Sequence, residues 1–148
     1  MTENAADVTL VDLTTGDARW AQALPVLQEL RPHLTAELLA QVLREGEPQG
    51  LRFTAVFTED RCVAVAGWRV IANTSAIRKL YIDDLSTAAT ERSRGYGALL
   101  LRELRNRAAA AGCRVLDLDS GVQRFDAHRF YLRERMDIVS HHFAQRLG

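Results

Sequence analysis

The sequence contains few of the residues that mark specialised protein classes. Its 148 residues include only two cysteines, Cys62 and Cys113, and three prolines. Small secreted domains stabilised by disulfides have many cysteines, and zinc sites built on cysteine need several at close spacing. Each cysteine here is flanked by residues typical of a strand or of its entrance. We therefore expect two buried free thiols rather than a disulfide or a metal pair.

The chain also has no net charge. It carries 19 basic and 19 acidic side chains, which gives a net charge of +0. Proteins that bind nucleic acid or anionic membranes commonly have a basic surplus that attracts phosphate. We therefore expect neither kind of partner, and any positive patch must be local.

Long apolar runs and internal repeats are absent as well. No segment approaches the length of about 20 apolar residues that spans a membrane. The first four residues, Met-Thr-Glu-Asn, do not resemble a secretion signal, so we expect a cytoplasmic protein. No linker interrupts the 148 residues, and their hydrophobic fraction of 47% is ordinary. We expect one domain over residues 1–148.

Apolar periodicity and turn residues predict a regular order of elements. Strands are expected at 8–13, 51–57, 62–71, 77–85, 114–118 and 138–143, and helices after Asp17, after Thr35, at 95–111 and at 125–135. The order β-α-α-β-β-β-α-β-α-β predicts an α/β fold in which a mixed sheet has helices on both faces.

The most informative segment is the glycine-rich turn at 92–98, Arg-Ser-Arg-Gly-Tyr-Gly-Ala. It joins a predicted strand to a long predicted helix, so bare backbone amides and the positive end of the helix meet at one point, where an anionic diphosphate would be stabilised. A dinucleotide fingerprint would need glycine in place of Leu100, and no Gly-Lys-Ser/Thr of a P-loop occurs. A plain glycine-rich turn is the alternative.

Two motifs resemble those of one family. The pattern Arg92-x-x-Gly95-x-Gly97, between a strand and an amphipathic helix, resembles the acetyl-CoA-binding motif of the GNAT acetyltransferases. The segment from Asp126 to Tyr131 is similar to the final helix of that family, where a tyrosine follows an alanine by four residues. The resemblance covers nearly the whole chain, but specific motifs lie only between Leu80 and Met136. It implies the GNAT fold.

The resemblance also implies an activity and a co-substrate. The activity is transfer of an acetyl group from acetyl-CoA to a primary amine, by direct attack in a ternary complex and without a metal. The backbone of Leu85 and Thr87 would pair with the pantetheine arm, along a strand edge that is exposed where the sheet splays. The diphosphate would be bound by Arg92, Arg94, Gly95, Tyr96, Gly97 and Ala98. For Arg92 the alternative is a solvated surface charge.

Three further roles are expected near the reacting atoms. Tyr131 would protonate the departing thiolate, unless it is simply a half-buried tyrosine tethered to backbone. Asp84 would act as general base and Asp83 would bind the substrate amine. Neighbouring strand residues face opposite ways, so only one of these two should reach the cleft unless a bulge intervenes. The alternative is that one caps a turn and the other is exposed.

A further acid on the next predicted strand completes the candidate site. Asp119 shares one face with Asp117 and is expected to line the acceptor site, or else to make a turn with Ser120. His141 and His142 face opposite sides of a predicted strand and cannot chelate one metal as a pair, so no metal site is expected.

Departures from the family pattern lie mainly around the last helix. Arg124 stands where relatives usually have asparagine, and Arg135-Met136 stands where they commonly have Gly-Phe. An arginine at a left-handed helix end is strained or requires another termination geometry. These departures leave open an altered acceptor or a loss of activity.

Several alternatives remain open at this stage. A non-catalytic acyl-CoA-binding module that regulates a partner is the second functional class, and a nucleotide-dependent activity the third. The acceptor amine, whether a small molecule or a peptide, is not identified by the sequence. Family members often pair through the last strand, so a homodimer is also expected.

Overall fold

The computed structural model describes residues 7–148. The chain divides into two compact units, the first ending at Asp117 and the second running from Leu118 to Gly148. The expectation of one domain over the whole chain stays a prediction.

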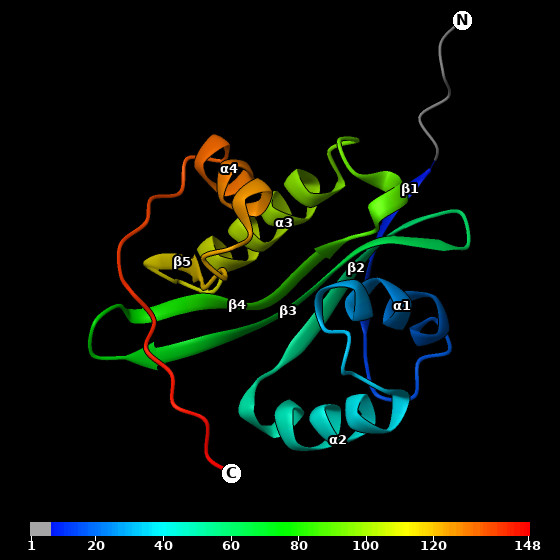
Figure 1. Ribbon diagram of the computed structural model, residues 1–148, viewed down its shortest axis with the longest axis horizontal. Helices are drawn as coiled ribbons and strands as arrows, with labels where there is room; N and C mark the ends of the chain where they lie inside the picture. The colour runs from blue at the N-terminus through cyan, green and yellow to red at the C-terminus, as the bar shows by residue number, and fades with distance from the viewer. Residues whose placement is uncertain (1–6) are drawn as a thin grey trace, which may run out of the picture. The chain divides into compact units, whose positions relative to one another are not determined.

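The centre of the structure is a five-stranded sheet whose strand order follows the chain, β1-β2-β3-β4-β5 (Figure 1). Its strands are β1 Val8–Leu13, β2 Arg52–Thr58, β3 Arg61–Asn73, β4 Ile77–Thr87 and β5 Val115–Leu118. The first three pairings are antiparallel. The mixed sheet and the α/β class predicted from the sequence are confirmed.

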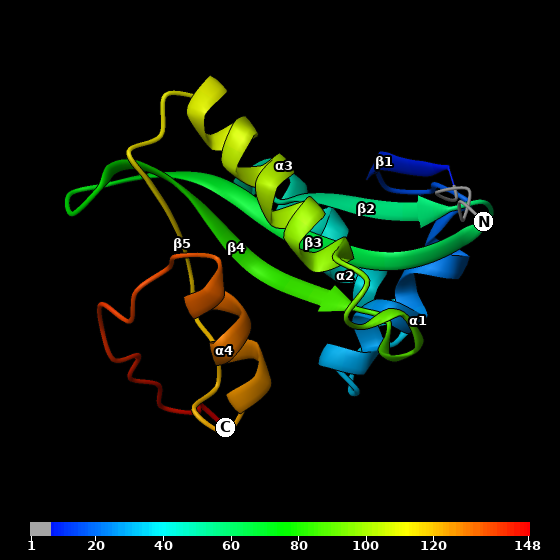
Figure 2. The same ribbon diagram turned by 90° about the horizontal axis from the view of Figure 1, so that it is seen from above.

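Helices cover both faces of this sheet. They are α1 Trp20–Leu30, α2 Ala36–Gly46 and α3 Tyr96–Ala110, with short 3₁₀ turns η1 Glu47–Gln49 and η2 Ala89–Glu91. Figures 1 and 2 show α1 and α2 on one face and α3 on the other. The Thr35 hydroxyl caps α2 by accepting from the Leu38 amide at 3.1 Å, at the point where the sequence predicted a helix to begin.

The core has two halves because β2 and β3 are buried on both faces. Under α1 and α2, side chains such as Leu27, Leu43 and Phe53 form one cluster. Leu100 and Leu104 of α3 are fully buried as well.

Both cysteines are free, and burial raises the pKa of the Cys62 thiol to about 12. Cys113 is only partly buried.

A bulge interrupts the pairing of β3 with β4. Gly67 lies opposite Asp84 and Trp68 lies opposite Ile82, so Asp83 is the extra residue on β4. A bulge bends its strand and redirects the side chains beside it. Alternation along this strand was expected unless a bulge intervened, and the bulge makes it fail at the two aspartates.

The second unit contains one helix, α4 Phe125–Arg133, which ends two residues earlier than expected. The Met136 amide donates to the Tyr131 carbonyl and the Arg135 amide to the Leu132 carbonyl, each at 3.0 Å. Arg135 has a φ of 64°. These bonds form a Schellman motif in which arginine occupies the left-handed position that usually holds glycine.

The predicted last strand, 138–143, is wrong. Residues 136–148 have neither helix nor strand. Side chains of this segment are strongly exposed, with Val139 at 82% and Phe143 at 92%. A strand needs a neighbour that pairs with its backbone groups, and apolar alternation alone does not supply one.

Within residues 7–148, none of the helices combines the length and apolar character that a membrane crossing requires.

Candidate active site

The glycine-rich turn leads directly from η2 into α3. Ser93 and Gly95 both have positive φ, 69° and 85°. Gly95 is the N-cap of α3 and no side chain caps the helix there. Glycine adopts this conformation without steric penalty, whereas Ser93 does so under strain. The turn that the sequence predicted is therefore formed, and α3 begins at Tyr96.

The start of α3 leaves backbone amides available. The first described bond within the helix runs from the Leu99 amide to the Gly95 carbonyl at 2.9 Å. The amides of Tyr96, Gly97 and Ala98 thus precede the first amide that donates within the helix, and no described backbone group accepts from them. Arg92 and Arg94 are exposed beside them. Bare amides, a helix dipole and two cations suit a diphosphate.

Glu91 supports this turn and was not anticipated from the sequence. It is only 4% exposed. Its Oε1 lies 2.8 Å from Nη2 of Arg61 and its Oε2 lies 3.4 Å from Nη1 of Arg94. The carboxylate thereby ties the turn to the start of β3 and holds Arg94 near the helix. Nothing in the local pattern distinguishes a buried glutamate from an exposed one.

The edge of β4 is only partly covered by β5. The Arg114 amide donates to the Arg78 carbonyl at 2.8 Å, and Lys79 forms an ion pair with Asp117 at 2.9 Å, so β5 starts beside the beginning of β4. β5 has 4 residues and β4 has 11. A strand of that length cannot pair with the whole edge. The pantetheine arm was expected to pair with the part of β4 that includes Leu85 and Thr87.

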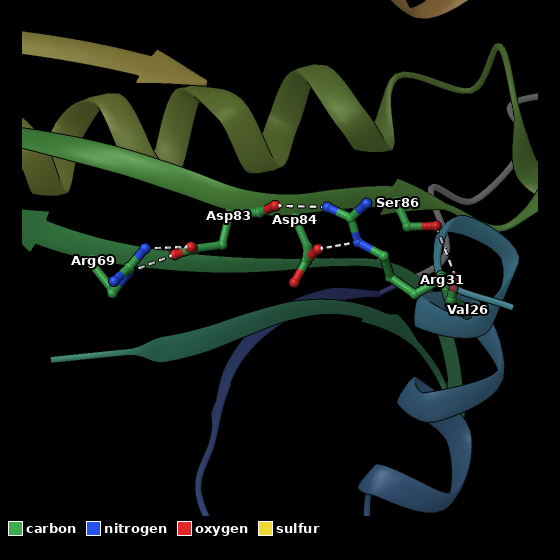
Figure 3. A network of polar contacts seen from close by, with 6 residues as sticks. All are labelled: Val26, Arg31, Arg69, Asp83, Asp84 and Ser86. Atoms are coloured by element: carbon green, nitrogen blue, oxygen red, sulfur yellow. Dashed lines mark hydrogen bonds and ion pairs between the residues drawn. The ribbon is translucent and has the colours of Figure 1, made fainter. Parts of the chain in front are cut away.

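The two aspartates of the bulge are each paired with an arginine (Figure 3). Nε and Nη2 of Arg69 donate to the Asp83 carboxylate at 3.0 and 2.7 Å. Nε of Arg31 donates to Oδ1 of Asp84 at 2.8 Å, and its Nη2 donates to the Asp83 carbonyl at 3.1 Å. The nearby Ser86 hydroxyl donates to the Val26 carbonyl at 2.7 Å, which ties β4 to α1.

Asp83 and Asp84 line one cavity of about 360 Å³ together with both arginines. The remaining walls come from α2 and the start of β2: Val42, Glu45, Gly46, Gln49, Leu51 and Phe53. The bulge is what allows adjacent strand residues to face the same space. Arg31 and Arg69 were not identified from the sequence, because nothing local shows that they oppose these acids.

The environment of Asp84 alters its acidity. Burial raises the pKa of Asp84, while the hydrogen bond and positive charge of Arg31 act in the opposite direction. Asp83 adds a smaller upward influence on this pKa, and His33 a smaller downward one. A carboxylate with a raised pKa is a stronger base than an exposed one. Its Oδ2 accepts no hydrogen bond from the described residues.

Gly67 makes room for the Asp84 carboxylate. A Cβ at this position would lie 2.8 Å from Cε1 of Phe53 and 3.2 Å from Oδ2 of Asp84. Both distances are shorter than ordinary carbon contacts. The glycine is therefore required by close approach and not by its backbone conformation.

In the second unit, Tyr131 is partly buried beside Arg124. Burial raises the pKa of Tyr131, and the charge and hydrogen bond of Arg124 partly oppose that rise. The phenol is therefore protonated at neutral pH. Because a guanidinium only donates, Arg124 leaves the phenolic proton available for transfer. The arginine that replaces the usual asparagine of the family thus contacts the expected acid.

Asp119 also belongs to the second unit. Its Oδ1 lies 3.6 Å from Nδ1 of His142. His128 is hydrogen-bonded through Nε2 to the Gly121 carbonyl at 2.7 Å. Among residues 7–148, no group of three or more metal-binding side chains is close enough to hold an ion.

Comparison with known proteins finds similarity over most of the chain. The sequence profile described as "Acetyltransferase (GNAT) family" matches residues 17–136. The chain is 35% identical over 118 residues to the uncharacterised N-acetyltransferase YhdJ of Bacillus subtilis (strain 168), covering 79% of this chain and 83% of the relative.

Solved structures share the fold at low sequence identity. Aminoglycoside N-acetyltransferase AAC(6')-Iy in complex with CoA has a TM-score of 0.83 at 10% identity, over 99% of both chains. A transcriptional regulator from Bacillus halodurans C-125 has a TM-score of 0.79 at 19% identity, over 95% of this chain and 100% of that one. These structures show the fold, and the profile and the bacterial relative establish that this chain is an acetyltransferase and belongs to the GNAT family.

Proposed function

We propose that the protein transfers the acetyl group of acetyl-CoA to a primary amine of a small molecule. The amine attacks the acetyl carbonyl carbon directly while both substrates are bound, a C–N bond forms, and the C–S bond to coenzyme A breaks. Holding both reactants in one complex would supply much of the rate by proximity.

One observation carries the proposal: β4 connects two sites of complementary chemistry. Its bulge presents Asp83 and Asp84 to a cavity, and three residues after Asp84 the strand ends at Thr87. The chain then enters the turn with bare amides that opens α3. A strand advances by about 3.3 Å per residue, so an extended coenzyme arm along this edge would connect the two sites.

The family profile and the turn geometry together support acetyl-CoA as co-substrate. In this proposal the amides of residues 96–98 and the side chains of Arg92 and Arg94 bind the diphosphate, and the backbone of Leu85 and Thr87 holds the pantetheine arm. Glu91 positions Arg94. No metal is needed for the step.

Asp84 is proposed as the general base. An ammonium ion must lose a proton before its nitrogen can attack, and the raised pKa of Asp84 supports that role. Asp83 would attract the ammonium together with Asp84. Asp119 is kept as a proposed acceptor-binding residue of the second unit.

Tyr131 is proposed as the acid that protonates the departing thiolate. The nitrogen loses two protons as the ammonium becomes an amide. One leaves through Asp84 to solvent, and the other restores the phenol after Tyr131 has protonated the sulfur. The raised pKa of Tyr131 supports this assignment because the phenol must start protonated.

A thiol-release assay tests the proposal. Purified protein, acetyl-CoA and a panel of primary amines should release free CoA in proportion to acetylated product. Calorimetry with CoA alone provides the control for binding. Binding of CoA without release with any amine would favour the non-catalytic module, the alternative function. Absence of CoA binding would exclude both.

A further inference from the structure

The charge arrangement of the cavity at the bulge is informative, because two of its acids are already paired with arginines of the same chain. Three acidic side chains, Glu45, Asp83 and Asp84, and two basic ones, Arg31 and Arg69, line it. The acids exceed the bases by one. A site built for a polycation would instead present several carboxylates with no internal cation.

Each ion pair leaves a defined group unused. Nε and Nη2 of Arg69 both donate to the Asp83 carboxylate. Nε of Arg31 donates to the Asp84 carboxylate, and its Nη2 donates to the Asp83 carbonyl. No described residue forms a hydrogen bond with Nη1 of either arginine or with Oδ2 of Asp84. The cavity thus offers Oδ2 of Asp84 and the exposed carboxylate of Glu45 for an ammonium, and two guanidinium groups for an anion.

The rest of the lining is apolar on one side. Val42, Leu51 and Phe53 contribute aliphatic and aromatic surface, and Leu51 and Phe53 are anchored in the core. The volume of about 360 Å³ is near the lower end of the range for small-molecule sites, about 300–1,000 Å³. A small ligand with a modest apolar group suits these dimensions.

We propose that the acceptor is a small zwitterionic amine, an α-amino acid with an apolar side chain, and not a polycation. This inference rests on the proposed function. The ammonium would lie at Oδ2 of Asp84, the carboxylate would accept from Nη1 of Arg69, and the side chain would contact Leu51 and Phe53. A polyamine would bring several charges to a site with one surplus acid.

Matched pairs of amines test this proposal on the intact protein. L-leucine is compared with 3-methylbutylamine and L-phenylalanine with 2-phenylethylamine, pairs that differ only by the carboxylate, and spermidine and kanamycin serve as polycations. CoA release is measured for each. We expect kcat/KM to be about tenfold or more higher for the amino acids, the size of a charge-assisted hydrogen bond. Faster turnover of the decarboxylated amines or polycations would overturn the inference and leave the proposed function standing.

The variant Arg69→Gln separates recognition of the carboxylate from other effects. It should bring the ratio of kcat/KM within each pair towards one, while CoA affinity stays unchanged because the diphosphate turn is built from other residues. A ratio unchanged in this variant would contradict the assigned role of Arg69. If no amine releases CoA, the proposed function fails. Calorimetry of the same pairs with CoA present then tests the inference by itself. It is overturned if the amino acids bind no more tightly than the amines that lack the carboxylate.

Discussion

At the scale of single residues, the Arg31–Asp84 pair determines the protonation of the candidate base. A base works only when deprotonated, so the rate falls as the pH drops through its pKa. Burial raises that pKa above the ordinary value and Arg31 lowers it. The acidic limb of the pH profile should therefore report on this ion pair.

Replacing Arg31 with methionine should move the acidic limb of kcat/KM to higher pH. Loss of the cation removes the effect that opposes burial, so the pKa of Asp84 rises further. Profiles for the wild type and Arg31→Met are measured with one amine at saturating acetyl-CoA. Arg44→Met, an exposed position on α2, is the control and should leave the limb in place. A limb that stays or moves to lower pH contradicts the base assignment.

Replacing Tyr131 with phenylalanine should reduce kcat by about 100-fold, within the usual range for a general acid. The ring is retained and only the hydroxyl is lost, so the affinity for CoA should change little. Steady-state kinetics and calorimetry measure the two quantities. Turnover equal to wild type would remove the acid role and leave Tyr131 as a packing residue.

Replacing Gly67 with alanine should destabilise the protein by about 1–3 kcal/mol, as overpacking commonly does. The added methyl would press on the Phe53 ring and on Oδ2 of Asp84, neither of which can move freely. Urea unfolding measures the loss. Gly121→Ala is the matched control, because its closest neighbour is the flexible end of Gln123. Equal stability of the two variants would show that the site relaxes easily.

At the scale of elements, the end of α4 shows how hydrogen bonding can override residue preference. The Schellman bonds of Arg135 and Met136 hold arginine at a φ of 64°. A side chain in this conformation costs roughly 1–2 kcal/mol. The usual Gly-Phe end of the family would avoid that strain.

Arg135→Gly should therefore stabilise the protein by about 1 kcal/mol, read as a higher midpoint in urea. Glu134→Gly is the control, since Glu134 has a negative φ of −81° and gains nothing from glycine there. The control should be neutral or destabilising. A lower midpoint for Arg135→Gly would mean that contacts of the arginine side chain outweigh its backbone strain.

The β4 strand is the element where sequence reasoning was half correct. Its apolar pattern predicted the strand and placed both aspartates near its end. Alternation predicted that one of them would face away, and the bulge at Asp83 brings both to the cavity. A bulge depends on the pairing register with β3, which a single strand does not encode.

At the scale of the whole molecule, the pairing of distant segments builds the cavity. Arg31 follows α1 and Arg69 lies on β3, yet both contact the aspartates of β4. Glu91 and Arg61 meet in the same way. The cytoplasmic location and the homodimer stay predictions, and the strand through which pairing was expected is not formed.

Local chemistry was sufficient for the elements up to the last helix, for the fold class and for the glycine-rich turn, because each depends on periodicity or on residues adjacent in the chain. Gly95 and the apolar face of α3 could be identified from the sequence without knowledge of any tertiary contact. The partners of Asp83, Asp84 and Glu91, and the failure of the last strand, were decided only in three dimensions. Charges far apart in the chain pair once the sheet brings them together, and a strand forms only where a neighbour accepts its hydrogen bonds.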